Sequence, residues 1–289
     1  MSACPAVDAV ALAPGGRYLY IARRAYLGRR GLVPASILQI RAPTSAPARV
    51  FPLRRFGSGT PILVSPDGKT VYLASTFRHS DAVKRLRVPS GKEAKPIPFG
   101  SYRNQIWQLA ISGNGRRLYV LSIGQGKGAL TQINAVTGRV IGSVPIPGHP
   151  MDMAIMPGGK RLYVTSEFNH VTVVRTATLS VVKSLTVGFA WAVAITPDGR
   201  AAYVTGSAYQ TTGDGQVTAI RTASNLAKLF QSGYLCQEPV QLGVDAFQLC
   251  TRRVPPHTAG RKEVAPWEGA RVLLRPASLN ASIRLGLNS

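Results

Sequence analysis

Two groups of residues in this sequence could do chemistry, and they differ in their arrangement. The first group pairs histidines with carboxylates in segments that do not repeat: His149 precedes Asp152, and Glu167 precedes His170. A histidine beside a carboxylate can act as a general acid or base. Each pair occurs once, and most polar residues in such segments are solvated surface, so the sequence favours no catalytic residue.

The same non-repeating segments hold further side chains that could contact a small ligand. Loops of this kind carry binding residues more often than the elements they connect. Trp191, together with Trp107, is expected mainly to pack between sheets. The candidate ligand-binding residues are His79, Tyr102, Arg103, His149, Asp152, Glu167, His170, Trp191 and Tyr209.

The second group is cationic. The 289 residues include 35 Lys and Arg against 12 Asp and Glu, a formal net charge of +23. Such an imbalance attracts polyanions, including nucleic acid. A plainer interpretation, in which the cations only solvate their turns, stays open. The candidate polyanion-binding residues follow repeated turns and are Arg17, Arg41, Lys69, Arg87, Arg116, Arg117, Lys160, Arg161, Arg175, Arg200, Arg221 and Arg275.

These turns belong to a repeated unit of four short, β-branched runs, stated most clearly at 150–206. Four such runs with turn residues between them predict a four-stranded antiparallel sheet. A turn followed by a tyrosine recurs along the chain with a period of roughly 40–50 residues, which is typical of a β-propeller blade. The recurring tyrosines are Tyr20, Tyr72, Tyr119, Tyr163 and Tyr203.

A second recurring element extends the count of blades. Its markers are Arg41, Arg87, Asn134, Arg175, Arg221 and Arg275. The last copy, at 273–279, matches the pattern at 173–179, so the C-terminal part is interpreted as a degenerate sixth blade. We therefore expect an all-β, single-domain propeller of six four-stranded blades, with a seventh left open. The expected blades are residues 1–57, 58–103, 104–149, 150–189, 190–233 and 234–289.

In such a blade the first strand lies nearest the axis and the fourth lies outermost. The first turn (strands one to two) and the third turn (strands three to four) then share one face, which should carry the cations. We expect a continuous fourth strand at 93–99 in the second blade. A basic loop without strands is expected at 23–34 in the first.

The repeats resemble the bacterial YVTN β-propeller proteins, through Pro-Asp-Gly-Arg-Ala-Ala-Tyr-Val-Thr at 197–205 and related segments. The resemblance is strong from 6 to 224 and weak from 226 to 269. It implies the propeller fold and says little about function, because propellers host many activities. Where the family usually has Asp, this chain has Arg41 and its five equivalents. Many of the relatives have seven blades.

Three functions follow from this resemblance and from the charge. The first is a non-catalytic binding or scaffold module for a protein or polyanionic partner. The second is a lactonase-like hydrolase acting on a sugar lactone, as some similar propellers are. The third is a nucleic-acid-binding propeller that uses its basic face.

The remaining expectations concern cofactors, cysteines and location. Acidic residues are too few for a calcium cage, and no metal or nucleotide motif occurs, so no cofactor and no metal are expected. Cys236 and Cys250 could form a disulfide in an oxidising compartment. The chain as written shows no signal peptide and no membrane span, and the compartment stays open between the cytoplasm and export. A monomer is expected.

Overall fold

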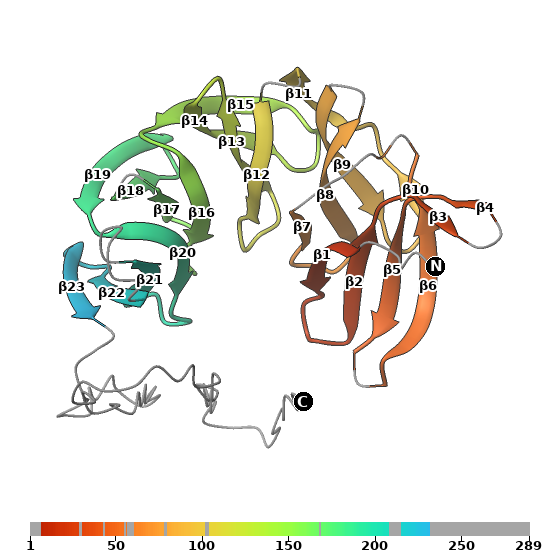
Figure 1. Ribbon diagram of the computed structural model, residues 1–289, viewed down its shortest axis with the longest axis horizontal. Coiled ribbons are helices and arrows are strands. Elements are labelled where there is room, and N and C mark those ends of the chain that lie inside the picture. Colours follow the sequence, from red (N-terminus) through yellow and green to blue (C-terminus); the bar gives the residue numbers. More distant parts are fainter. Residues whose placement is uncertain are drawn as a thin grey trace, which may run out of the picture. The chain divides into compact units, whose positions relative to one another are not determined.

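The computed structural model describes residues 7–28, 31–42, 44–54, 56, 61–77, 80–101, 104–167, 169–207 and 215–231. The chain divides into one unit of residues 1–230 and another of residues 231–289, and the fold described here is that of the first. All regular secondary structure in the described residues is β-strand (Figure 1). The strands form five antiparallel sheets and one separate hairpin.

The five sheets follow one another along the chain. Sheet 1 contains β1 (Val7–Leu12), β2 (Tyr18–Arg23), β5 (Ser36–Arg41) and β6 (Ala46–Pro52). Sheet 2 contains β7 (Ile62–Val64), β8 (Thr70–Phe77), β9 (Ser80–Arg87), β10 (Lys92–Glu93) and β11 (Ile97–Ser101). Sheet 3 contains β12 (Asn104–Ile111), β13 (Arg117–Gly124), β14 (Lys127–Asn134) and β15 (Val140–Ile146). Sheet 4 contains β16 (Pro150–Ile155), β17 (Arg161–Ser166), β18 (His170–Arg175) and β19 (Ser180–Thr186). Sheet 5 contains β20 (Phe189–Ile195), β21 (Ala201–Ser207), β22 (Gly215–Arg221) and β23 (Leu226–Gln231).

Two predictions about individual strands were wrong. The predicted fourth strand at 93–99 is broken into β10 and β11, which both pair with β9. The break falls at Pro96, which has no backbone N–H to donate to a strand partner. The predicted loop at 23–34 contains a two-stranded hairpin of β3 (Tyr26–Gly28) and β4 (Gly31–Val33).

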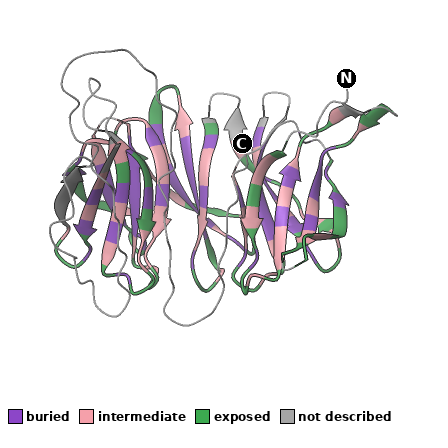
Figure 2. Ribbon diagram, turned by 60° about the horizontal axis from the view of Figure 1, so that its bottom comes forward, coloured by how far each residue is buried: buried purple, intermediate pink, exposed green. Residues whose placement is uncertain are grey.

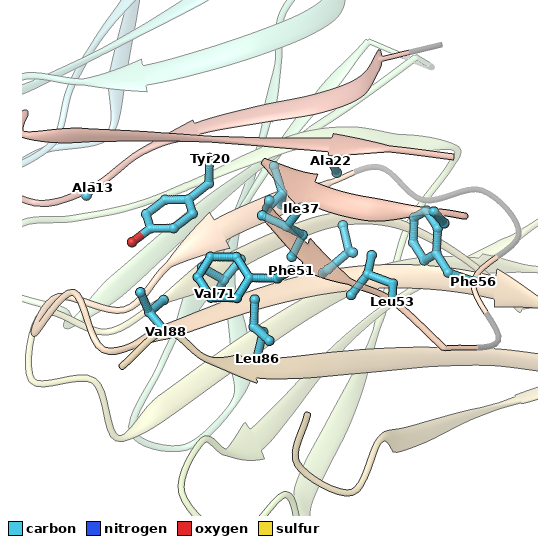
Figure 3. Packing of buried hydrophobic residues seen from close by; sticks show 13 residues of the cluster. Ala13, Tyr20, Ala22, Ile37, Phe51, Leu53, Phe56, Val71, Leu86 and Val88 are labelled. Carbon is cyan, nitrogen blue, oxygen red and sulfur yellow. The ribbon is translucent and has the colours of Figure 1, made fainter. Parts of the chain in front are cut away.

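The core of this unit lies between facing sheets. Residues of sheet 1 pack against residues of sheet 2 in one buried cluster, and Figure 3 shows Phe51 among Ile37, Val71 and Leu86. Similar clusters join sheets 2 and 3, sheets 3 and 4, and sheets 4 and 5. Burial of these apolar faces stabilises the stack by about 25 cal/mol per Å² of area removed from water.

The first strands of successive sheets lie beside one another, in the order β1, β7, β12, β16 and β20 (Figure 1). Three of these strands carry a half-buried alanine at the same register position, Ala11, Ala110 and Ala154. Small side chains suit strands that lie this close together. Ala194 occupies the same register position in β20 but is exposed.

The first and third turns of each sheet lie at the same end, as predicted. In every sheet, the residue that opens the third turn donates its backbone N–H to the carbonyl of the cation in the first turn. The five bonds are Ala42 to Arg17 (3.0 Å), Val88 to Lys69 (2.9 Å), Ala135 to Arg116 (3.0 Å), Thr176 to Lys160 (3.1 Å) and Thr222 to Arg200 (3.0 Å). Figure 2 shows turns at the lower end of the sheets, with exposed residues along them.

Side chains also connect each described sheet to the next at this end. A donor on one sheet reaches the carbonyl of the residue that opens the third turn of the following sheet, and we call these contacts latch bonds. The four latch bonds are Arg49 to Val88 (3.2 Å), Arg85 to Ala135 (3.4 Å), Gln132 to Thr176 (3.1 Å) and Arg161 to Thr222 (3.0 Å). They fix the turns of adjacent sheets against each other, so cations on those turns keep a defined spacing.

Candidate functional site

The cations of the first and third turns form a surface that we call the basic rim. Of the twelve residues predicted for it, ten are exposed, and eight of these ten are arginines. The basic rim is defined by Arg17, Arg41, Lys69, Arg87, Arg116, Arg117, Lys160, Arg175, Arg200 and Arg221. The geometry that gathers them is the pairing of first and third turns at one end of every sheet.

Two of the twelve predicted residues do not belong to this exposed set. Arg161 is half-buried, and its Nη1 donates the latch bond to the Thr222 carbonyl at 3.0 Å. The guanidinium of Arg161 therefore connects sheets 4 and 5, and the predicted polyanion-binding role of Arg161 stays a prediction. Arg275 lies outside the described residues.

Two carboxylates in the first turns, Asp67 and Asp198, are engaged by their own turns. Asp67 Oδ1 accepts hydrogen bonds from Ser65 Oγ at 2.5 Å and from the Lys69 backbone N–H at 3.0 Å. The hydrogen bond from Ser65 is the main reason that the pKa of Asp67 lies below its usual value. Asp198 is held in the same way, and its pKa is also lowered. Each carboxylate thus closes a turn, and Asp198 Oδ2 also lies 3.7 Å from Nε of the rim residue Arg200. Most of the other rim cations have no carboxylate partner within the described residues.

Asn114 closes the equivalent turn of sheet 3 without a charge. Its Oδ1 accepts from Ser112 Oγ at 2.7 Å and from the Arg116 backbone N–H at 3.1 Å. The turn therefore needs an oxygen acceptor at this position and not a negative charge. The rim around Arg116 and Arg117 consequently has no carboxylate in its own turn.

Two hollows lie on the rim, one where sheets 2 and 3 meet and one on sheet 3 alone. The larger, of about 580 Å³, is lined by cations from both sheets, Arg85 and Arg87 from β9 and Arg116 from the first turn of sheet 3. The second, of about 520 Å³, is lined by Arg116 and Arg117. Arg116 therefore borders both hollows, and Asn114 borders both as well.

Arg85 is a member of this site that the sequence analysis did not include. It lies in the third strand, opposite Tyr72 and two residues before the marker residue Arg87, which ends that strand. The recurring tyrosines could have revealed it, because the residue paired with each tyrosine faces the next sheet. Gln39 and Gln132 occupy the same register position opposite Tyr20 and Tyr119.

The acid–base pairs at the other end of the sheets differ from those predicted. His149 Nδ1 lies 3.4 Å from Glu167 Oε2, and both side chains are partly exposed. The expected partner of His149, Asp152, instead accepts bonds from Gln108 Nε2 at 2.9 Å and from the Met153 backbone at 2.8 Å. Its second oxygen accepts the Val193 backbone N–H at 3.0 Å. Asp152 therefore connects sheets 3, 4 and 5, and the predicted His149–Asp152 pairing was wrong.

The two tryptophans at this end occupy β-bulges of the first strands. Trp107 lies at the bulge of β12 and makes an edge-to-face contact with His149, with ring centroids 5.7 Å apart. Trp191 lies at the bulge of β20 and is 50% exposed, so the expectation that it packs between sheets was wrong. A bulge adds one residue to a strand and redirects its side chain.

The other predicted residues at this end form no shared cluster in the described structure. His170 opens β18 and is half-buried, and Glu167 pairs with His149 rather than with it. Four predicted ligand-binding residues lie outside the described residues: His79, Tyr102, Arg103 and Tyr209. The cysteines Cys236 and Cys250 also lie outside them. No group of three or more metal-binding side chains occurs within the described part, and no helix there could cross a membrane.

Comparison with known proteins identifies the fold. No protein-family profile and no curated protein matches the sequence. A structure of Kuenenia stuttgartiensis hydrazine synthase is similar, with a TM-score of 0.59 and 20% sequence identity. The similar region covers 75% of this chain and 64% of the hydrazine synthase chain. The β-propeller domain of Cps50 (Swd1) from Myceliophteria thermophila is similar with a TM-score of 0.60 and 13% identity, covering 80% of this chain and 73% of that one. At these identities the likeness concerns the fold alone, which is a β-propeller.

Proposed function

We propose that this chain is a YVTN-type β-propeller that acts as a non-catalytic binding module, and that its basic rim holds a polyanionic partner. The observation that supports this most is the exposure of ten cations on one set of turns, with Asp67 and Asp198 engaged in closing their own turns. In each sheet, the backbone carbonyl of the first-turn cation accepts a hydrogen bond from the third turn, which fixes the position of that cation. The positive field is therefore built into the repeat.

The composition of the rim favours a partner with many oxyanions. Arginine presents a planar fork of donors that fits phosphate and carboxylate groups, and eight of the ten rim cations are arginines. Binding of this kind releases counterions from the partner, so it weakens as salt rises. Single-stranded nucleic acid and acidic polypeptide segments both satisfy this description.

Charge reversal tests the proposal. The double variant Arg175→Glu and Arg221→Glu should weaken binding of a labelled single-stranded oligonucleotide or of poly-glutamate by at least about tenfold, measured by fluorescence anisotropy. The matched control is Lys127→Glu with Lys183→Glu, which changes charge by the same amount at exposed positions away from the rim. Equal losses in both double variants would contradict a binding role for the rim.

Lactonase-like hydrolysis is a second candidate, supported by the His149–Glu167 contact of 3.4 Å at the end opposite to the rim. A half-exposed histidine beside a carboxylate could activate a water molecule. Turnover of a sugar lactone that is lost in His149→Ala and in Glu167→Gln would support this function. Absence of turnover across a panel of lactones by the unchanged protein would contradict it.

A further inference from the structure

The junction between sheets 2 and 3 differs from the other junctions along the rim. At each junction three register positions meet: the residue opposite the recurring tyrosine, the marker residue two positions later, and the cation in the first turn of the next sheet. Among the four junctions between described sheets, only this one has arginine at all three. Its residues are Arg85, Arg87 and Arg116, whereas the others have Gln39, Arg41 and Lys69; Gln132, Asn134 and Lys160; and Val173, Arg175 and Arg200.

The three arginines line the hollow of about 580 Å³ and have different roles in it. Arg85 is held in place, because Nη1 donates to the Val136 carbonyl at 2.9 Å and Nη2 donates to the Lys95 carbonyl at 3.0 Å. Its buried Nε has no hydrogen-bond partner. Arg87 and Arg116 are exposed, and their guanidinium groups make no hydrogen bond or ion pair with other described residues.

Polar groups beside the arginines complete the lining. Asn114 Oδ1 accepts two hydrogen bonds within its own turn, which leaves the amide Nδ2 as a donor. Asp67 also lines the hollow, and its Oδ1 is engaged by Ser65 and Lys69. Three guanidinium groups against one carboxylate leave two positive charges. This charge matches that of a phosphate dianion.

We propose that this hollow is a phosphate-binding site, in which Arg87 and Arg116 contact the phosphate oxygens and Arg85 supplies a fixed charge behind them. The inference rests on the proposed polyanion-binding function and specifies the group that the rim recognises. The hollow exceeds the size of one phosphate, so a phosphodiester with its flanking groups fits the same space. A free phosphate and a nucleic acid phosphodiester both present anionic non-bridging oxygens to the arginines, with two negative charges on the free dianion and one on the diester.

A matched pair of double variants tests this site. Arg87→Gln with Arg116→Gln removes the two exposed arginines of the hollow. Arg175→Gln with Arg200→Gln removes the arginines at the two equivalent register positions of the junction between sheets 4 and 5. At that junction Val173 occupies the position of Arg85. Binding of a labelled single-stranded oligonucleotide should fall at least about tenfold in the first variant and about two- to threefold in the second, since charged hydrogen bonds contribute more than diffuse charge.

A third variant separates the charge of Arg85 from its latch bond. Gln132 shows that glutamine at this register position still donates to the next third turn, at 3.1 Å. Arg85→Gln should therefore retain the thermal stability of the protein and lose about threefold in oligonucleotide affinity. Unchanged affinity in a stable Arg85→Gln protein would overturn the part assigned to Arg85.

The remaining outcomes distinguish the ligand source and the two proposals. If inorganic phosphate displaces the oligonucleotide from the unchanged protein but not from Arg87→Gln with Arg116→Gln, the site binds free phosphate. If inorganic phosphate does not displace it, and this double variant still loses more oligonucleotide affinity than the control double variant, the site binds a phosphodiester. Equal losses in both double variants overturn this inference and leave the proposed function standing. If the two double variants differ in poly-glutamate affinity as much as they differ in oligonucleotide affinity, the site does not prefer phosphate, and the assignment of phosphate as its ligand is overturned. Failure of the unchanged protein to bind any of these probes overturns both proposals.

Discussion

The side chain that opposes anion binding most directly is Asp67, which lines the larger hollow. Asp67→Asn should keep the turn, because Asn114 closes the equivalent turn with the same two hydrogen bonds. Removal of one negative charge from the lining of the hollow should raise oligonucleotide affinity about two- to fivefold at low salt. Fluorescence anisotropy measures the change, and Asp198→Asn, in the first turn of sheet 5, is the control. An unchanged or lower affinity in a folded Asp67→Asn protein would argue against binding in this hollow.

Asp152 illustrates how a polar residue chosen for chemistry can serve the fold. Its two carboxylate oxygens accept three hydrogen bonds from three sheets. Asp152→Asn should lower the free energy of unfolding by about 2 kcal/mol, because one oxygen that accepts a backbone N–H becomes an amide donor. Urea unfolding measures this loss, with Glu167→Gln as a control at a partly exposed position. A stable Asp152→Asn protein would contradict the connecting role.

Four of the recurring tyrosines are predicted to limit stability at high pH. Burial raises the pKa of Tyr20, Tyr72, Tyr163 and Tyr203 above the usual value. Because the folded protein holds these protons more tightly than the unfolded chain, stability is fully present below about pH 10 and declines as the pH rises through the raised values. Ultraviolet absorbance of tyrosinate should therefore show a late phase that coincides with loss of the β-sheet circular dichroism signal. A single phase for all 10 tyrosines near their usual pKa, with the sheets intact, would contradict this.

At the scale of elements, the latch bonds hold successive sheets together. Arg49 donates to the carbonyls of Val88 and Pro89, both at 3.2 Å, and its guanidinium lies 4.8 Å from the centre of the Phe51 ring. Arg49→Ala should reduce the free energy of unfolding by about 2 kcal/mol. Lys183→Ala, on the exposed surface of β19, should change it by less than about 0.5 kcal/mol. Urea unfolding compares the two, and equal effects would mean that this latch bond contributes nothing.

The pattern of turns and tyrosines was enough to predict the sheets, because each turn residue imposes a local backbone geometry. The shared end of the first and third turns followed from antiparallel order and is confirmed. The break between β10 and β11 was missed although Pro96 marks it, since an outer strand tolerates proline and the pattern continues on either side. The β3–β4 hairpin was missed because its two strands have only three residues each, too few to show an alternating pattern.

The hydrogen-bond and ion-pair partners of individual side chains were harder to predict from the sequence. Arg161 carries the same turn signal as the exposed rim cations, yet it donates to Thr222, 61 residues away. His149 pairs with Glu167 because the strands β16 and β17 bring their ends together, whereas Asp152 is closer in sequence. Contacts of this kind depend on register and on the neighbouring sheet, which the spacing within one repeat does not specify.

At the scale of the whole molecule, one local rule produces a long positive surface. Each sheet contributes a cation from its first turn, four of the five described sheets add an arginine from the third turn, and asparagine replaces that arginine in sheet 3. The net charge of +23 is therefore organised by the repeat. A generic basic surface would place its cations without regard to the turns.

The salt dependence of oligonucleotide binding distinguishes a basic rim that binds a partner from a surface that is merely positively charged. The unchanged protein should bind a labelled single strand with an affinity that falls steeply and linearly on a double-logarithmic plot against salt. A slope of about −3 or steeper corresponds to at least about four neutralised phosphates, and the slope should become shallower in Arg87→Gln with Arg116→Gln. Weak binding that vanishes by physiological salt, with the same slope in that variant, would contradict the claim that the basic rim is the working surface of this propeller.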